Sequence, residues 1–498
     1  MGATADDDGD KLPFSKARCI ALVLTVTGAA FLNTLGVQSA VIILPTIGRA
    51  LHIPDSRQQW IVSAYNLTFG CFLLLWGRLA DVYGKRLIFI WGSVWVTVTS
   101  ILVPLVPSEI GFDVFRGLQG LGAAAMVPTA IGILGVTFPP GRAKNYAFSC
   151  YGAGAPLGAI LGNIFGGVLG EYLDWRWVFW VFSILAALCS IAGYIFIPLP
   201  PPQPTPSVPN TIDWLGGTLI TLGLIVLLFA LSEGNVAGWR TPWVPTLIAV
   251  SLLLIAMFCA WQRHLERKAV RRPLMKLSIF KNAQFAAANV IMLLFFTSFN
   301  NYLIYATYWF QDYQGLSVIQ TTVRFVPTGV SGVLVALATS QLLAHLRAST
   351  ILTFGTLSLS LASLLFALPL APSTSYWAYG FPAMILSVCG ADTLFPTLTL
   401  FVAKSLPAED QALGGALISA VSQIGRAVGL AIATALQMAV VAVEKGVAVE
   451  EVGLLGPGDG ALKREIRGTA WFDFAVGIAA MGVVLGFFRG AGKVGGKH

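Results

Sequence analysis

Hydrophobic residues in this chain are grouped in long uninterrupted blocks, separated by short polar segments. A helix needs roughly 20 residues to cross ~30 Å of hydrocarbon, and these blocks have that length or more. Lipid offers a backbone no hydrogen-bond partner, so each block predicts a membrane-spanning helix. Ten-residue alternating segments, which are typical of a porin-like barrel, are not present. The predicted spans are residues 19–45, 58–77, 87–106, 113–137, 146–170, 177–198, 214–232, 243–262, 284–310, 320–344, 350–370, 376–402, 411–442 and 470–488.

Composition agrees with this pattern. Of the 498 residues, 56% are hydrophobic and only 11% are charged, whereas a soluble domain has about 25% charged residues. The first block is too long for the apolar region of a cleavable signal peptide. The six cysteines lie within or beside apolar blocks, which predicts packing residues and neither disulfides nor a metal site. We therefore expect an all-α integral membrane protein.

The distribution of Lys and Arg predicts the orientation of the helices. With the N-terminus inside, 20 of the 31 basic residues lie on the inner side and 8 on the outer side, and Arg116, Arg324 and Arg426 lie within spans. Basic loops stay in the cytoplasm, so both termini are expected there. The net charge of +8 then reflects membrane topology, and no nucleic-acid partner is expected. The plasma membrane is the first expectation for the location, and the vacuolar membrane is the alternative.

Two linkers divide the predicted helices into groups of six, two and six. The first linker is Pro-rich, residues 198–209, and the second is basic, residues 263–281. The expected parts are a cytoplasmic tail (1–18), a six-helix bundle (19–198), a segment with both linkers and two inserted helices (199–283), a second six-helix bundle (284–488) and a cytoplasmic tail (489–498).

The two groups of six look related to each other. The loop after span two, residues 77–86, has a weaker counterpart after span ten, residues 340–347. The glycine-rich span five has a counterpart in span thirteen, and both matches share an offset of roughly 264 residues. Duplicated halves predict two pseudo-symmetric bundles, as in many transporters.

The loop after span two contains the most specific motif. It reads G-R-L-A-D-x-x-G-K-R and includes Gly77, Arg78, Asp81, Gly84, Lys85 and Arg86. The glycines allow a tight turn, Asp81 is placed to cap a helix end or meet a cation, and the basic residues anchor the inner face. An ordinary turn with inside-facing charges is the alternative interpretation.

This loop resembles the signature of the major facilitator superfamily. Span four is similar to the second motif of that superfamily, with Arg116, Gln119, Gly120 and Gly122. Span five resembles the glycine-rich antiporter motif, with Gly152, Gly154, Pro156, Gly158, Gly162, Asn163, Gly166 and Gly167. Residues 57–65 and 138–147 are similar to a fungal subgroup with aminotriazole-resistance proteins, boron exporters and low-affinity ammonium transporters. The resemblance implies the fourteen-helix drug:proton antiporter branch and a major-facilitator fold.

Two positions depart from the pattern of that branch. Gly36 occupies the place where many members have an Asp in span one, so the role of that carboxylate does not carry over. Tyr83 stands where Arg is frequent in the loop motif.

Ionisable residues inside a span are costly and often functional. Asp392 in span twelve is the predicted proton-coupling carboxylate, and a structural role, including a pair with Arg426, is the alternative. The resemblance implies proton transfer for Arg116, which could instead extend toward the membrane surface. Polar residues in the first span of each half are candidates to line a cavity, with interhelical hydrogen bonding as the alternative; they are Asn33, Gln38, Asn300, Asn301 and Tyr305. The glycines of span five are expected to allow close helix packing rather than to touch substrate.

The sequence favours a secondary transporter over an enzyme. It has no nucleotide-binding G-x-x-x-x-G-K-[ST] motif and no catalytic constellation, and no cofactor or metal is expected. Proton-coupled export of a small solute or toxic compound is the predicted function, by alternating access in a monomer whose partners are substrate, protons and the bilayer. A low-affinity ammonium or boric acid transporter is the alternative. A transporter-like sensor is the alternative of another class.

The charge distribution makes a testable prediction about topology. A cysteine introduced by Lys276→Cys lies in the basic loop, which carries 7 of the inner basic residues. We expect it to react with a membrane-impermeant thiol reagent only after the cells are permeabilised. Labelling of this cysteine in intact cells would contradict the orientation.

Overall fold

The computed structural model describes residues 12–53, 60–139, 141–199, 212–239, 241–268, 273–368, 374–406, 411–445, 460–489 and 492. Most of both predicted tails, nearly all of the Pro-rich linker, part of the basic loop and residues 57–59 of the fungal segment lie outside the described residues.

Within this part of the chain, fourteen helices are long and apolar enough to cross a membrane, as predicted. The helices are α1 (Lys16–Ile42), α2 (Leu44–Ala50), α4 (Trp60–Tyr83), α5 (Lys85–Leu102), α6 (Glu109–Thr137), α7 (Arg142–Tyr172), α8 (Arg176–Phe196), α9 (Trp214–Ala237), α10 (Trp243–Lys268), α11 (Ala283–Tyr308), α12 (Val318–His345), α13 (Ala348–Ala367), α14 (Tyr376–Ser405), α15 (Gln411–Lys445) and α16 (Gly460–Phe487). The short α2 is the one α-helix among them that is not a membrane span. The last span begins earlier than residue 470, where the sequence placed it, and this difference affects the candidate site.

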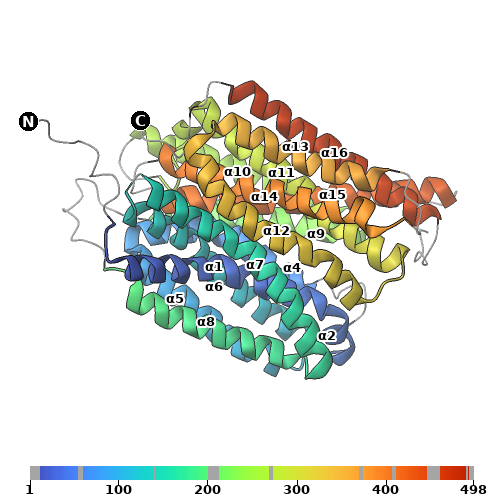
Figure 1. Ribbon diagram of the computed structural model, residues 1–498. Coiled ribbons are helices and arrows are strands. Elements are labelled where there is room, and N and C mark those ends of the chain that lie inside the picture. Colours follow the sequence, from blue (N-terminus) through green and yellow to red (C-terminus); the bar gives the residue numbers. More distant parts are fainter. Residues whose placement is uncertain are drawn as a thin grey trace, which may run out of the picture.

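The spans form two six-helix bundles and one inserted pair. Helices α1 and α4–α8 pack together, α11–α16 form the second bundle, and α9 and α10 lie beside them. Figure 1 shows the spans running side by side along one common direction, with the start of α1 and the end of α16 at the same end of the molecule. The side of the membrane that this end faces stays a prediction.

A stripe of glycines on α7 brings its backbone against α1. Gly154, Gly158, Gly162 and Gly166 recur every four residues and therefore lie on one face of the helix. A Cβ added at Gly158 would lie 2.3 Å from the carbonyl oxygen of Phe31, and one added at Gly162 would lie 2.9 Å from that of Leu35. Neither position has room for a side chain, so these glycines permit close helix packing, as the sequence predicted.

The same contact recurs between α11 and α15 in the second bundle. A Cβ at Gly425 would lie 2.4 Å from the carbonyl oxygen of Leu293, and one at Gly429 would lie 2.7 Å from that of Thr297. Thr297 Oγ1 also donates to the carbonyl of Gly425 at 2.9 Å. Each bundle thus has its first helix held backbone to backbone against its fifth, which gives the pseudo-symmetry a physical form.

The inserted helix α9 contacts both bundles. It packs against α10, against α4 of the first bundle and against α15 of the second. Trp60 Nε1 of α4 donates to Glu233 of α9 at 2.8 Å. At the other end of α9, Asp213 caps the helix and accepts from Trp261 Nε1 (3.0 Å) and Gln262 Nε2 (2.7 Å) of α10. These bonds join the inserted pair to each other and to α4.

The glycine stripe predicts a sharp difference between two glycine-to-alanine variants of α7. Gly158→Ala forces a methyl group against the Phe31 carbonyl and should lower the free energy of unfolding by about 1–3 kcal/mol, as overpacking does. Gly167→Ala is the control, because no atom lies within 4 Å of its added Cβ, and it should keep or slightly raise stability through helix propensity. Thermal unfolding of the two purified proteins in detergent measures this, and equal melting temperatures would contradict the packing role.

Candidate functional site

The motif loop joins α4 to α5 and touches the second bundle. Gly84 connects the two helices with φ of 101°, a conformation that favours glycine. The side chain of Asp81 is almost fully buried and accepts a salt bridge from Lys85 Nζ at 2.8 Å. It also accepts a hydrogen bond from the backbone N–H of Leu413 at 3.3 Å. Leu413 lies in the first turn of α15, where N–H groups lack intrahelical partners and attract a carboxylate.

The basic residues of the loop hold the first bundle together. Arg86 Nη2 donates to the carbonyl of Tyr194 in α8 at 2.7 Å, and its guanidinium lies 5.4 Å over the Tyr194 ring. Arg78 is buried near the end of α4. Asp81 thus contacts the other bundle, and Arg86 joins α5 to α8 within the first bundle.

Further contacts between the bundles lie near the same end or at mid-helix. Gln341 of α12 donates to the Tyr146 hydroxyl of α7. A Cβ added at Gly415 of α15 would lie 2.8 Å from Ile131 of α6. A Cβ at Gly152, from the predicted glycine motif, would lie 3.0 Å from Pro396 of α14, so this glycine faces the other bundle. The two bundles are therefore in contact at the motif-loop end.

Arg116 is the centre of a buried network within the first bundle. Its side chain has 0% exposure, donates from Nε to the Ile61 carbonyl at 2.9 Å and donates from Nη1 to Gln119. The guanidinium lies 4.9 Å over the ring of Tyr65, whose hydroxyl donates to Asn33 at 2.8 Å. Extension of Arg116 to the membrane surface, one alternative from the sequence, is therefore wrong. The network joins α1, α4 and α6. Asn33 takes part in it by accepting the hydrogen bond between α4 and α1.

The neighbours of this network account for two other predicted positions. Gln119 Nε2 donates a hydrogen bond to the Ser100 hydroxyl of α5 at 2.7 Å. A Cβ added at Gly120 would lie 2.3 Å from the Tyr65 carbonyl oxygen, so α6 packs closely against α4 there. Gly36, which replaces an expected Asp, faces the Phe182 ring. A Cβ added at Gly36 would lie 2.9 Å from a carbon atom of that ring. An Asp at that position would collide with the ring.

Asp392 lies in the middle of α14 at the interface between the bundles. It is 7% exposed. A Cβ added at Gly332 of α12 would lie 2.7 Å from Asp392 Oδ2 and 2.9 Å from Pro156 of α7. The structure thus brings the predicted carboxylate, a glycine of its own bundle and a proline of the predicted glycine motif together. Among the residues that the structure describes, Oδ2 has no hydrogen-bond partner.

Arg426 does not pair with Asp392, contrary to one interpretation of the sequence. Its guanidinium lies 4.8 Å over the ring of Phe296 in α11. No salt bridge joins the two side chains within the described part of the chain. The aromatic ring therefore takes the place of the expected carboxylate as the neighbour of this cation.

A second carboxylate at depth was missed from the sequence. Asp473 lies near the middle of α16 and is 1% exposed. Asp392, the carboxylate that the sequence singled out, is therefore not the only acidic residue buried in the middle of a span. The error follows from placing the start of the last span at residue 470, which put Asp473 at a helix end and Glu465 in a loop. Glu465 is also buried, in the earlier part of α16.

The candidate cavity residues fall into two groups. Asn301 and Tyr305 are buried and make interhelical bonds: Asn301 Nδ2 donates to the Gly429 carbonyl and to Asp473, and the Tyr305 hydroxyl donates to Gln437 at 2.9 Å. Asn33, Gln38 and Asn300 are partly exposed, as is Asn163 of the span-five motif. A cavity-lining role for the candidate residues stays a prediction. No group of three or more metal-ligating side chains occurs among the described residues.

Comparison with known proteins decides the family. A sequence model of the Major Facilitator Superfamily matches residues 26–430, well over half of the chain. The protein belongs to the Major Facilitator Superfamily. The low affinity ammonium transporter of Saccharomyces cerevisiae is 31% identical over 438 residues, which cover 86% of this chain and 84% of that protein. The efflux pump terJ of Aspergillus terreus is 30% identical over 487 residues, which cover 96% and 89%.

A solved structure agrees with the fold of this Major Facilitator Superfamily member. The human organic anion transporter MFSD10 aligns with a TM-score of 0.66 and 14% identity, over 94% of this chain and 99% of that one. At this identity the likeness supports the fold alone. The relatives confirm the fungal subgroup expected from the sequence and a transporter rather than an enzyme.

The contact of Asp81 with α15 predicts that the motif loop controls movement between the bundles. A hydrogen bond to a charged group is worth about 1.5–3 kcal/mol, so Asp81→Asn should slow transport by about tenfold or more. Gly84→Val should do the same, because its positive φ strains a β-branched residue. Tyr83→Phe changes an exposed residue of the same turn and should transport normally. Transport by the three variants at equal surface expression measures this, and full rates in Asp81→Asn would overturn the gating role.

Proposed function

We propose that this member of the Major Facilitator Superfamily is a proton-coupled exporter of a small solute or toxic compound. The relative named as an efflux pump covers nearly the whole chain at 30% identity, which supports export. The single observation that carries proton coupling is Asp392, buried mid-helix between the bundles. The plasma membrane, cytoplasmic termini and a monomer complete the proposal, supported by the bias of basic residues and the pseudo-symmetric bundles within one chain.

The position of Asp392 suits a proton carrier. Its carboxylate faces Gly332, which packs against Pro156 of the other bundle, so Asp392 lies close to where the two bundles meet. An ionised carboxylate without a cation is costly in such surroundings. Rocking of one bundle against the other replaces these apolar neighbours by water from one side. Asp392 then exchanges its proton with that side only, which couples the proton to the conformational cycle.

The contact at the motif-loop end supplies the other half of the mechanism. Asp81, Lys85 and the first turn of α15 hold this end closed, together with the bond between Gln341 and Tyr146. In alternating access this contact must break when substrate enters from that side. The closed end therefore supports a state whose substrate path leads to the opposite side. Gln38 and Asn300, which are partly exposed, are the proposed cavity residues for substrate contact.

A second candidate function is low-affinity transport of ammonium. The relative that carries this name is 31% identical over 86% of the chain. Ammonium passes with its own charge and needs no separate proton carrier, so this function would leave Asp392 with a structural role. A growth screen of a deletion strain against toxins, borate and methylammonium separates the candidates, and altered growth in the last condition alone favours ammonium. Boric acid transport and a sensor without flux are further outcomes of the same screen.

Asp392→Asn tests the coupling. In proteoliposomes with an imposed pH gradient, the variant should lose accumulation of substrate against its gradient and keep substrate exchange, which needs no net proton movement. Asp174→Asn removes a carboxylate that is half exposed and paired with Arg176, and it should accumulate substrate normally. If Asp392→Asn still responds fully to the pH gradient, Asp392 is structural. Coupling would then rest on Arg116 or be absent.

A further inference from the structure

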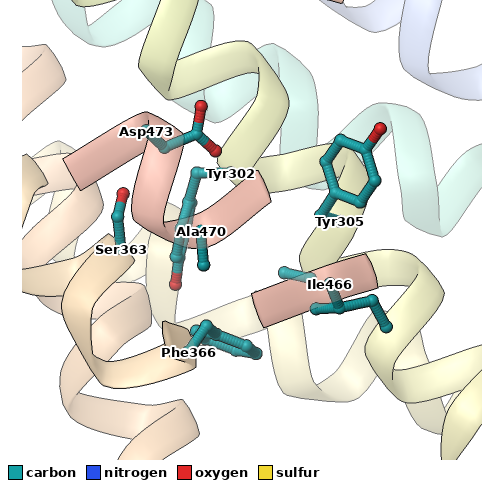
Figure 2. A pocket seen from close by; sticks show the side chains of 8 residues that line it. Tyr302, Tyr305, Ser363, Phe366, Ile466, Ala470 and Asp473 are labelled. Atoms are coloured by element: carbon teal, nitrogen blue, oxygen red, sulfur yellow. The ribbon is translucent and has the colours of Figure 1, made fainter. Parts of the chain in front are cut away.

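A buried polar cluster lies inside the second bundle, away from the interface that holds Asp392. Asp473 of α16, Tyr302 and Tyr305 of α11, and Ser363 and Phe366 of α13 surround a small cavity of about 10 Å³. This is about the smallest volume that can hold one water molecule. Figure 2 shows Asp473 and Ala470 on one wall, with the two tyrosines beside them.

The bonds around Asp473 leave it short of a donor. Asn301 Nδ2 donates to Asp473 Oδ1 at 3.2 Å and to the Gly429 carbonyl at 3.1 Å, so both hydrogens of the amide are in use. Within the described residues, no cation forms a salt bridge with Asp473. Asn301 Oδ1 is buried and has no hydrogen-bond partner there. The pair therefore has one carboxylate without a counter-ion and one amide oxygen without a donor.

A single proton resolves both deficits. We propose that Asp473 is a second proton-binding site, in which the protonated carboxyl and the Asn301 amide form a two-point pair. The amide donates to Oδ1, and the proton on Oδ2 is donated to Asn301 Oδ1. The carboxyl becomes neutral, which removes the cost of an unpaired charge at this depth, and the orphan acceptor is satisfied.

The other titratable groups near Asp473 do not supply a counter-charge. The titratable groups that face the cavity from α11 are the uncharged hydroxyls of Tyr302 and Tyr305. From α13 the cavity is lined by Ser363 and Phe366, which carry no charge. On α16 itself, Glu465 is another acid, and Arg467 directs its Nε to the Ala367 carbonyl at 3.0 Å. From α15, the groups bonded to this cluster are the Gly429 carbonyl and the Gln437 amide.

The proton at this site would fix α11 against α16. Besides the Asn301 pair, Ser298 of α11 donates to the Asp473 carbonyl at 3.0 Å. Asn301 also joins α11 to Gly429, one of the glycines in the close contact with α15. Loss of the proton places a bare charge where these three helices meet. The inference goes beyond the proposed function, since Asp473 lies within one bundle and its protonation can be measured without substrate.

Infrared spectroscopy of the purified full chain tests the proposal directly. The protein with Asp392→Asn and Glu465→Gln, which removes two other buried carboxyls of the spans, should keep a carboxylic-acid C=O band that disappears on alkaline titration. Adding Asp473→Asn should abolish this band, and adding Asp174→Asn should leave it in place. A band that survives Asp473→Asn would overturn the assignment. Because no substrate or gradient is involved, this result is independent of whether Asp392 couples transport.

Thermal stability gives a second readout that does not depend on a spectroscopic assignment. Asn at position 473 imitates the protonated carboxyl, so Asp473→Asn should fold. The melting temperature of the unmodified protein should fall as pH rises, because the buried carboxyl loses its proton, and Asp473→Asn should lose much of this fall. Titration with NaCl at constant ionic strength separates the rival ligand. Stabilisation by sodium at alkaline pH that requires Asp473 would show a cation site in place of a proton site and would overturn the proposal.

Discussion

The cost of an ionisable group in hydrocarbon constrains the whole arrangement. Three deep residues meet that cost in different ways. Arg116 has a carbonyl, an amide oxygen and two aromatic rings around it. Asp473 has one amide, and Asp392 has an oxygen without any partner in the described structure. A group with few fixed partners depends on its changing surroundings for its protonation state. Of the three residues, the protonation of Asp392 is therefore the most sensitive to movement between the bundles.

The glycine contacts decide where movement can occur. Backbone-to-backbone packing of α1 with α7, and of α11 with α15, leaves little room for one helix to shift against the other inside a bundle. The bundles contact each other through α7 with α12 and through α15 with α4 and α6, and Asp81, Gln341 and Pro396 contribute side chains to this interface. In the proposed alternating-access cycle the bundles would move as bodies, and the groups on the surface between them would experience the change.

Features that depend on the chain alone were predictable from the sequence. The apolar blocks gave fourteen spans, and the four-residue spacing of glycines gave the packing of α7. Features that depend on how helices face each other were not predictable. Arg426 lies over the Phe296 ring and does not pair with Asp392, because tertiary packing sets the rotation of α15 about its axis. Asp473 was missed because polar residues at the start of α16 look like a loop, and burial against α11 makes them part of the span.

The inserted helix α9 has a mechanical consequence. A helix that contacts both bundles must slide along at least one of them if the bundles move relative to each other. Its hydrogen bond from Trp60 to Glu233 fixes it to α4. It also packs against α15, and its sequence from Leu219 to Leu231 is mostly leucine, isoleucine, valine and phenylalanine. Dispersion contacts between such apolar side chains are short-ranged and undirected, so they do not fix one helix at a single position along the other. Helix α9 is thus hydrogen-bonded to α4 and packed against α15, so it would stay with α4 and slide along α15 if the two bundles turned against each other.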